Sequence, residues 1–366
     1  MSLPVIDLFA GAGGLSIGAT DAGCEVKASV ELDQKACQTL RANSHFHGNV
    51  AESDVSAMTG DDLRSLAGLT SSDPLIVVGG APCQPFSKAA YWVESGEEAK
   101  YRRARAAGKT APKPGIKTQA RPDERRDLVA EFWRLISESN ADGFVFENVP
   151  SIRHPKNRPV LEAFAQAATD AGYQVTELLG KAVEYGVAQK RERVFLLGSK
   201  NRKPVAPAQT HDASGDASLL LRPAVTTGEA LDGLDDERFF EPEEIVEGKW
   251  AQHLREVPPG WNYKAHTAWA GHPNPTFETE TRFWNFLLKL DPQKPSWTLA
   301  ASPGPWTGPF HWSSRRLRTV EMAALQGFPK GYEFCGSRRE RVKQLGNAVP
   351  PPMARAMVAA VAEAVA

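Results

Sequence analysis

Short apolar runs alternate with amphipathic segments through about the first 200 residues of the chain. Residues 5–9, 75–78 and 143–146 form short, largely apolar runs that predict buried strands. Between such runs, apolar side chains recur at helical spacing, for example in residues 125–139. This alternation predicts an α/β fold with a doubly wound, Rossmann-like sheet.

The strand–helix rhythm stops near residue 200. Residues 201–315 are rich in proline, glycine and tryptophan and carry an acidic stretch at 232–247. Helical spacing resumes near residue 319 and returns in a small-residue segment at the end of the chain. We therefore expect a first domain in 1–200, a smaller, irregular second domain in 201–315, and a return to the first domain in 316–366.

The composition is typical of a globular protein and does not by itself indicate a binding partner. The chain has 366 residues, 42% of them hydrophobic, and a formal net charge of −1. That length and apolar content suffice for two domains with a real core. The start lacks a basic stretch followed by an apolar one, and no apolar run approaches the ~20 residues that span a bilayer. We expect a cytoplasmic protein without a signal peptide or membrane segment.

Cysteines and histidines lack the spacing of the common metal motifs. The four cysteines form no C-x-x-C pair, which argues against a metal cluster or disulfide framework and for a reducing compartment. His253, His266, His272 and His311 also lack metal-ligand spacing. We therefore expect no metal.

Three glycines, Gly11, Gly13 and Gly14, follow the first predicted strand and precede a helix. Such glycines let the backbone approach a ligand and leave helix N–H groups facing it. The fit to a dinucleotide G-x-G-x-x-G pattern is imperfect, because Ser16 holds the last glycine position. Glu31 ends the next strand, 20 positions after Gly11 (31 − 11), where an acid can bind ribose hydroxyls. A nucleotide-like ligand is predicted; the alternative is a solvated acid at a strand end.

A cysteine framed by prolines follows the strand at 75–78. Two glycines end that strand, and Pro82 and Pro85 stiffen the turn on both sides of Cys83. The thiol then lies at the carboxyl end of a strand, where open α/β sheets bind their ligands. A lone cysteine is more often a core residue, but the proline frame favours a functional thiol.

Residues 88–126 are strongly basic, with eleven Lys and Arg against five acidic residues, or +6 (11 − 5). The segment lacks a sustained apolar stripe, so we expect a mobile loop hinged on Cys83. A basic lid beside a reactive thiol suits a polyanionic substrate. The alternative is a solvated, partly disordered insertion.

Two further polar groups interrupt predicted strands. Glu147 follows four largely apolar residues, where a carboxylate is costly to bury without a task or a partner. Gln189, Arg191 and Arg193 alternate along a strand and therefore share one face. They predict a polar surface that contacts a ligand, with an exposed charged edge as the alternative.

Six blocks of the chain, in order, resemble the DNA cytosine-5 methyltransferase family. Together they span nearly the whole chain, with the variable region 201–315 in the gap expected for that family. The resemblance implies a Rossmann-like S-adenosylmethionine-dependent methyltransferase sheet and no metal. The blocks are residues 7–14, 80–87, 147–149, 189–193, 316–329 and 344–349.

The resemblance assigns the catalytic residues. Cys83 would add to carbon 6 of cytosine, which makes carbon 5 nucleophilic enough to accept a methyl group. Glu147 would bind N3 of the ring and Arg193 would contact O2, with Arg191 supporting the site. The predicted contacts to the substrate or DNA are Gln84, Ser87 and Gln189.

The resemblance also implies S-adenosylmethionine as the methyl donor, which leaves as S-adenosylhomocysteine. Leu32 is a departure, because some members carry there an aromatic residue that stacks on adenine. Asp54 would meet the adenine amine, although it can also simply cap the next helix. The predicted cofactor residues are Phe9, Gly11, Gly13, Gly14, Glu31, Leu32, Asp54, Val55, Pro82, Asn347 and Val349.

The implied partner is duplex DNA, from which the target cytosine must be flipped out. Residues 88–126 would close over the DNA, and 201–315 would be the target recognition domain. We expect a monomer that acts separately from a cognate restriction endonuclease. A tRNA cytosine-5 methyltransferase, a catalytically silent DNA-binding protein and a nicotinamide oxidoreductase are the alternatives, in that order.

Overall fold

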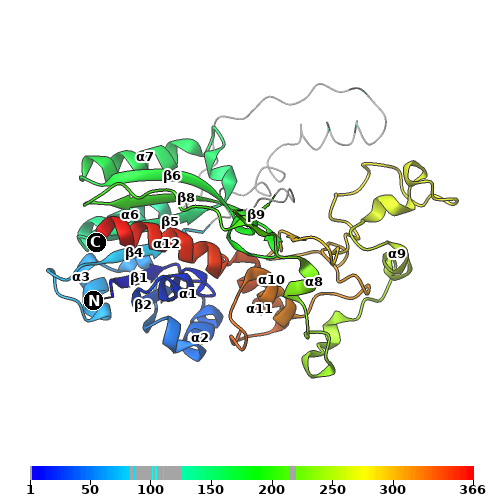
Figure 1. Cartoon of the computed structure of the whole chain (residues 1–366), viewed down its shortest axis with the longest axis horizontal. Coiled ribbons are helices and arrows are strands. Elements are labelled where there is room, and N and C mark those ends of the chain that lie inside the picture. The colour runs from blue at the N-terminus through cyan, green and yellow to red at the C-terminus, as the bar shows by residue number, and fades with distance from the viewer. Residues whose placement is uncertain are drawn as a thin grey trace.

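A seven-stranded sheet lies at the centre of the computed structural model, which describes residues 2–82, 86, 101, 104, 110, 126–213 and 220–366 (Figure 1). The strand order is β3-β2-β1-β4-β5-β8-β6. The strands from β3 to β5 are parallel, and β8 runs antiparallel to both β5 and β6. The strands are β1 (Pro4–Leu8), β2 (Glu25–Glu31), β3 (Asn49–Glu52), β4 (Ile76–Gly79), β5 (Gly143–Asn148), β6 (Gln174–Lys181) and β8 (Glu192–Ser199).

Helices cover both faces of this sheet. Side chains alternate along each strand, so Val77 joins one hydrophobic cluster while its neighbours Ile76 and Val78 join the other. The first cluster lies under α3 (Gly60–Ala67), α6 (Leu128–Glu138) and α7 (Arg158–Asp170). The second lies under α1 (Gly14–Asp21) and α12 (Pro351–Val365). The doubly wound α/β class predicted from the sequence is confirmed.

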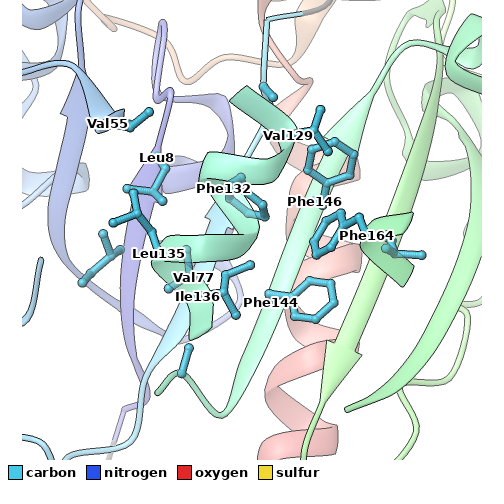
Figure 2. Close-up of a cluster of buried hydrophobic side chains, with 14 of the residues drawn as sticks. Leu8, Val55, Val77, Val129, Phe132, Leu135, Ile136, Phe144, Phe146 and Phe164 are labelled. Atoms are coloured by element: carbon cyan, nitrogen blue, oxygen red, sulfur yellow. The ribbon is translucent and has the colours of Figure 1, made fainter. Parts of the chain in front are cut away.

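The amphipathic pattern of α6 explains its position. Phe132 and Ile136 recur at helical spacing and are fully buried against the sheet. Figure 2 shows these side chains directed toward Val77, Phe144 and Phe146 of the strands beneath the helix. Contacts of this kind hold β4 and β5 side by side, which matters because both strands end at the predicted site.

The winding of the chain reverses between β1 and β4. β1 has β2 on one side and β4 on the other, so the connections leave these two strands in opposite directions. Open α/β sheets bind ligands at the carboxyl ends of the strands on either side of such a point. Residues 9–13 after β1 and residues 80–82 after β4 lie there.

The end of the chain returns to the sheet, as Figure 1 shows for α12. α12 follows α10 (Thr319–Gln326) and α11 (Arg338–Asn347). α2 (Gln34–Ala42) lies beside β2 and β3 at the other edge. None of the helices in the described ranges is long and apolar enough to cross a membrane.

The described parts of 201–315 contain only short elements. Val246, Leu254, Tyr263 and Phe310 belong to a small cluster of their own, whereas Leu299 packs with residues of α10 and α11. Domain boundaries at 200 and 315 therefore stay a prediction. The elements in and next to this region are β7 (Gln189–Lys190), β9 (His211–Asp212), β10 (Arg222–Pro223), α8 (Thr227–Ala230), η7 (Glu237–Phe239), η8 (Pro242–Glu244), α9 (Ala251–Glu256), η9 (Tyr263–His266), η10 (Ala268–Ala270) and β11 (Ser296–Trp297).

Candidate active site

The turn after β1 requires glycine for two reasons. Gly11 and Gly13 have φ angles of 56° and 81°, a backbone region that favours glycine. Gly14 opens α1 against Val349, where an added Cβ atom would lie 2.0 Å from the carbonyl oxygen. Phe9 also has a positive φ, 55°, which is unusual for a bulky residue and common at ligand sites. The predicted glycine loop thus meets the predicted segment around 347–349, although more than 300 residues separate them in the sequence.

His47 and Tyr332 brace this turn from behind. The Tyr332 hydroxyl donates to the Ala12 carbonyl at 2.8 Å, and His47 Nε2 lies 2.8 Å from the hydroxyl oxygen. Since the hydroxyl hydrogen is used on Ala12, His47 is the donor in the second bond. His47 is fully buried, and an added Cβ atom at Gly13 would lie 2.2 Å from its ring. The pair therefore fixes the path of the glycine turn.

The Glu31 carboxylate lies beside the turn and accepts three backbone hydrogen bonds. Oε2 accepts from Gly11 at 2.8 Å, and Oε1 accepts from Leu32 at 2.9 Å and Asp33 at 2.7 Å. An ionised carboxylate has about four acceptor positions, so Glu31 can accept a further hydrogen bond from a ligand hydroxyl. The placement agrees with its spacing from Gly11, and its binding to a ribose stays a prediction.

A cavity of about 490 Å³ adjoins the glycine turn, which is within the range typical of cofactor sites. Glu147 and Arg193 line the same cavity. Gly13 and Gly14 do not, and they act through the shape of the turn instead. The predicted cofactor residues that line it are Phe9, Gly11, Glu31, Leu32, Asp54, Val55, Pro82, Asn347 and Val349.

Two details of the lining bear on the predictions for the adenine end. Asp54 lines the cavity and also caps η2 (Val55–Ala57) by accepting a hydrogen bond from Ser56 N at 2.9 Å, so both alternatives for this residue fit the structure. Leu32 lines the cavity while 65% exposed, so its side chain is available to pack against a ligand.

A buried ion pair closes another part of the cavity. Arg193 Nε lies 2.6 Å from Glu147 Oε1, and the two residues are only 8% and 7% exposed. Burial raises the pKa of the Glu147 carboxyl, and the charges of Arg193 and Arg191 oppose that shift. A carboxyl of this kind can hold a proton toward a ligand nitrogen, and the guanidinium can stabilise charge on a ligand oxygen.

Ala81 and Phe86, which flank Cys83 in the sequence, are each held by a residue at or just after the end of β5. The Asn148 side chain donates to the Ala81 carbonyl at 3.1 Å, and the Ser151 hydroxyl donates to the Phe86 carbonyl. Each of these hydrogen bonds joins residues that are far apart in the sequence, so together they tie the end of β4 to the end of β5. In the sequence, Cys83 falls between these two positions.

The backbone before Cys83 also passes close to the ion pair. An added Cβ atom at Gly80 would lie 2.6 Å from Glu147 Oε2, so a larger residue there would displace the Glu147 carboxylate. Pro82, the residue before Cys83, lines the cavity. Cys83 itself lies outside the described residues, as do Gln84, Ser87 and most of 88–126.

Gln189, Arg191 and Arg193 are all buried, but the prediction that they lie along one strand is wrong, because β7 ends at Lys190, β8 begins at Glu192, and the Arg191 N–H donates to the Gln189 carbonyl at 2.9 Å in a turn between them. Their exposures are 0%, 1% and 8%, so the alternative of an exposed charged edge is wrong. Gln189 Oε1 accepts from the N–H of Leu299 at 3.2 Å, and Arg191 donates to the Gly346 carbonyl at 2.8 Å. These contacts tie later segments to the sheet, and the predicted roles of Gln189 and Arg191 toward a substrate stay predictions.

Four residues that support the site were not predicted from the sequence: His47, Tyr332, Asn148 and Ser151. Asn148 and Tyr332 lie in or near recognisable blocks, which was the available signal for them. His47 and Ser151 carried no signal, because an isolated histidine or serine is common anywhere in a chain. The distance of 285 positions between His47 and Tyr332 hides their contact from any local pattern.

Comparisons with known families and proteins identify the family of this chain. The profile of the C-5 cytosine-specific DNA methylase family matches residues 3–363. Type II methyltransferase M.SacI of Streptomyces achromogenes is 34% identical over 99% of this chain and 93% of its own length. Type II methyltransferase M.XorII of Xanthomonas oryzae pv. oryzae is 30% identical over 98% of this chain and 84% of its own length.

Solved structures share the fold. A DNA modification methyltransferase encoded within an E. coli prophage superposes with a TM-score of 0.66 at 23% identity, covering 98% of both chains. The S. pombe Dnmt2 methyltransferase gives a TM-score of 0.60 at 13% identity, covering 99% of both chains. The family match over nearly the whole length confirms the resemblance seen in the sequence and does not favour the tRNA alternative. This chain therefore belongs to the C-5 cytosine-specific DNA methylases and is a DNA methyltransferase.

Proposed function

We propose that the chain transfers a methyl group from S-adenosylmethionine to carbon 5 of a cytosine flipped out of duplex DNA, within a specific sequence. One observation carries the proposal. The buried Glu147–Arg193 pair lines the same cavity as Glu31 and the glycine turn, and so does Pro82, the residue before Cys83. A cofactor and a base bound there would be next to one another.

The cavity fits S-adenosylmethionine, which supplies a methyl group on a positively charged sulfur. Glu31 has acceptor capacity left for ribose hydroxyls, and Asp54 offers an acceptor for the adenine amine. Leu32 and Val55 supply apolar surface in the same lining. Asn347 and Val349 would close the pocket from the carboxyl-terminal side.

The residues of the chain activate the cytosine in two ways. The Cys83 thiolate adds to carbon 6, so that a carbon–sulfur bond forms and the electrons of the carbon 5–carbon 6 double bond become available at carbon 5. Glu147 holds a proton toward N3, and Arg193 stabilises the charge that develops at O2. After carbon 5 has gained the methyl group, it loses its proton to a base, the double bond re-forms, and the carbon–sulfur bond breaks to release the thiolate.

Access to the base requires opening the duplex, which costs a few kcal/mol of stacking and pairing. The basic segment 88–126 would contribute phosphate contacts. Residues 201–315, called the second region below, contain an exposed aromatic pair, Trp284 and Trp297. These side chains are 53% and 40% exposed, and their ring centroids lie 4.9 Å apart. Lys190 Nζ lies 4.9 Å from the Trp297 ring. Indole faces stack on bases and a lysine attracts phosphate, so we propose this surface as a DNA contact.

The pair lies close to the proposed catalytic arginine. Trp297 of β11 pairs with Lys190 of β7, and Lys190 precedes Arg193 by three residues. Three residues of even fully extended chain span about 10 Å, so the Cα atoms of Lys190 and Arg193 are at most about that far apart. The aromatic pair is therefore attached to the same short stretch of backbone as Arg193, which is why we propose it as part of the DNA-binding surface.

Bisulfite sequencing of DNA from cells that express the chain tests the proposal. We expect conversion-resistant cytosines in one sequence context for the wild type and none for Cys83→Ala. Methylation that survives Cys83→Ala would overturn the assigned nucleophile. Labelling of tRNA alone, with DNA left unmodified, would restore the tRNA alternative and overturn the DNA substrate.

The relatives are named type II methyltransferases. On that basis we propose that the chain works as a monomer, separately from a restriction endonuclease that cuts the same sequence. Sedimentation of the purified enzyme with and without a DNA duplex tests the monomer, and a two-to-one complex on one site would contradict it.

A further inference from the structure

Three groups with unshared electron pairs converge in the second region, and none of them lines the cofactor cavity. Glu256 ends α9, His266 ends η9, and His272 follows η10 in the next loop. One potential ligand atom from each lies within 4.8 Å of the other two. Their sequence spacing gave no metal motif, and the fold brings them together.

His266 is held in the orientation of a ligand. It is 1% exposed, and its Nε2 lies 2.8 Å from the backbone carbonyl of His253. A carbonyl only accepts, so Nε2 carries the proton and the neutral ring has its unshared pair on Nδ1. A histidine that binds a metal usually donates its other nitrogen to a carbonyl or carboxylate in this way.

The unshared pair of His266 faces a carboxylate without a hydrogen between them. Nδ1 lies 3.9 Å from Glu256 Oε2, which is too long for a hydrogen bond. Two electron-rich atoms that face each other across such a gap repel unless a cation lies between them. Ligand atoms around a tetrahedral zinc ion lie about 3.4 Å apart, given bonds of about 2.1 Å, so a small closure would complete the geometry.

His272 is the third potential ligand, and binding a metal would disrupt a hydrogen bond that its ring accepts. Its ring centroid lies 5.2 Å from that of His266, and its Nδ1 accepts a hydrogen bond from Asn274 N at 3.2 Å. Coordination by either ring nitrogen competes with this long contact. Metal binding would therefore change the hydrogen bonding of His272 more than that of His266.

The position of the cluster indicates a structural role. The surrounding hydrophobic cluster is small, and its members come from short elements and loops, including Leu254, Tyr263 and Phe277. Small cores of this kind often depend on a metal or a disulfide for stability. An ion held by Glu256, His266 and His272 would join α9 to η9 and to the loop after η10.

We propose that Glu256, His266 and His272 bind one divalent transition metal ion, with Zn²⁺ the best match to two imidazoles and a carboxylate. Water would occupy the remaining position. The ion would stabilise the loops of the second region and take no part in methyl transfer. This proposal departs from the expectation of no metal that the cysteine and histidine spacing and the family resemblance gave.

Metal content tests the proposal independently of methylation. The full chain, purified without a histidine tag, is loaded with Zn²⁺, passed over a chelating resin and measured by inductively coupled plasma mass spectrometry. We expect about one ion per chain in the wild type. In Glu256→Gln and His272→Ala, the amount of metal retained per chain should fall by about tenfold or more. Matched controls are Glu278→Gln and His45→Ala, which remove an exposed carboxylate and an exposed imidazole outside the cluster and should keep the ion.

Melting curves and a spectroscopic probe complete the test. Zn²⁺ should raise the melting temperature of the wild type and both controls relative to EDTA, and it should leave the two cluster variants unchanged. Co²⁺ loading of the wild type should give the absorption of a nitrogen-coordinated ion, which stays informative even if a variant fails to fold. No retained metal in the wild type, or equal metal in the cluster variants and controls, would overturn the site.

Discussion

The two ends of the proposed reaction complex are built in opposite ways. Around the cofactor cavity, polar groups lie at strand ends and are held by backbone partners, as Glu31 is by three N–H groups. In the second region, Trp284 and Trp297 stand exposed on loops and a two-residue strand. Chemistry needs a few atoms at fixed distances, which a sheet supplies. A DNA contact needs varied, accessible surface, which irregular loops supply.

The two regions meet through buried polar contacts. Arg318, which precedes α10, makes a buried ion pair with Glu244 of η8, and Arg315 pairs with Glu321 at 2.7 Å. The Gln189 side chain adds a hydrogen bond from the N–H of Leu299 at 3.2 Å. Removing one residue of a buried ion pair destabilises the fold more than the intact pair stabilises it, because the remaining charge is buried without a partner. These pairs therefore favour one specific packing of the two regions.

The largest effect is expected from a substitution at Glu147, in the catalytic part. Glu147→Gln should lower the single-turnover rate of methyl transfer by roughly 10²- to 10⁴-fold, because the proton held toward N3 is lost. Binding of S-adenosylmethionine should change little. Glu177→Gln is the control, since that carboxylate pairs with Arg153 at 2.6 Å outside the cavity lining. A Glu147→Gln enzyme as fast as the control would remove Glu147 from the mechanism.

The exposed aromatic pair gives the next largest effect. Trp297→Ala should weaken DNA binding by about tenfold or more, because stacking on one base is worth ~1–3 kcal/mol. Trp269→Ala is the matched control, since Trp269 is 68% exposed and also lies under a lysine, Lys264, at 5.6 Å. Fluorescence anisotropy with a labelled duplex measures both. Equal losses in the two variants would mean that exposed tryptophan in general, rather than this pair, matters.

The brace behind the glycine turn should have a smaller, selective effect. Tyr332→Phe removes the bond to Ala12 and should raise the dissociation constant for S-adenosylmethionine by about fivefold, with kcat nearly unchanged, since a neutral hydrogen bond is worth ~1 kcal/mol. Tyr173→Phe removes a hydroxyl bond to Ala141 outside the cavity lining and serves as the control. Isothermal titration and steady-state rates separate the two constants. A fall in kcat alone would contradict a role in cofactor positioning.

Asp7 should affect stability and leave activity almost unchanged. Burial raises the pKa of its carboxyl from 3.8 to about 7, against the hydrogen bonds from Ser16 that favour the charged form. The folded protein therefore binds a proton that the unfolded chain has lost, and stability should fall as pH rises from about 4 to about 7. Asp7→Asn, which keeps the acceptor for Ser16 and mimics the neutral form, should flatten that slope in melting curves between about pH 5 and about pH 7. An unchanged slope would show that another group is responsible.

Much of the catalytic half was predictable because its signals are local. The continuous apolar run before Gly79 and the spacing from Gly11 to Glu31 each follow from short-range rules, and the structure places both Gly11 and Glu31 at the cavity. Gln189, Arg191 and Arg193 were predicted to lie along one strand, but a turn at Arg191 divides them between β7 and β8. Their burial was not predicted, because it depends on Leu299 and Gly346, which lie more than 100 residues later.

The amino-acid sequence by itself determined the α/β class, the glycine turn, the family and the identity of the proposed catalytic residues. These features follow from periodicity and from short motifs, which act between residues that are near in the chain. Only the tertiary structure decided that His47 and Tyr332 brace the glycine turn, that Arg193 pairs with Glu147, and that Glu256, His266 and His272 converge. Such contacts depend on how loops from distant segments pack, and no local pattern of residues carries that information.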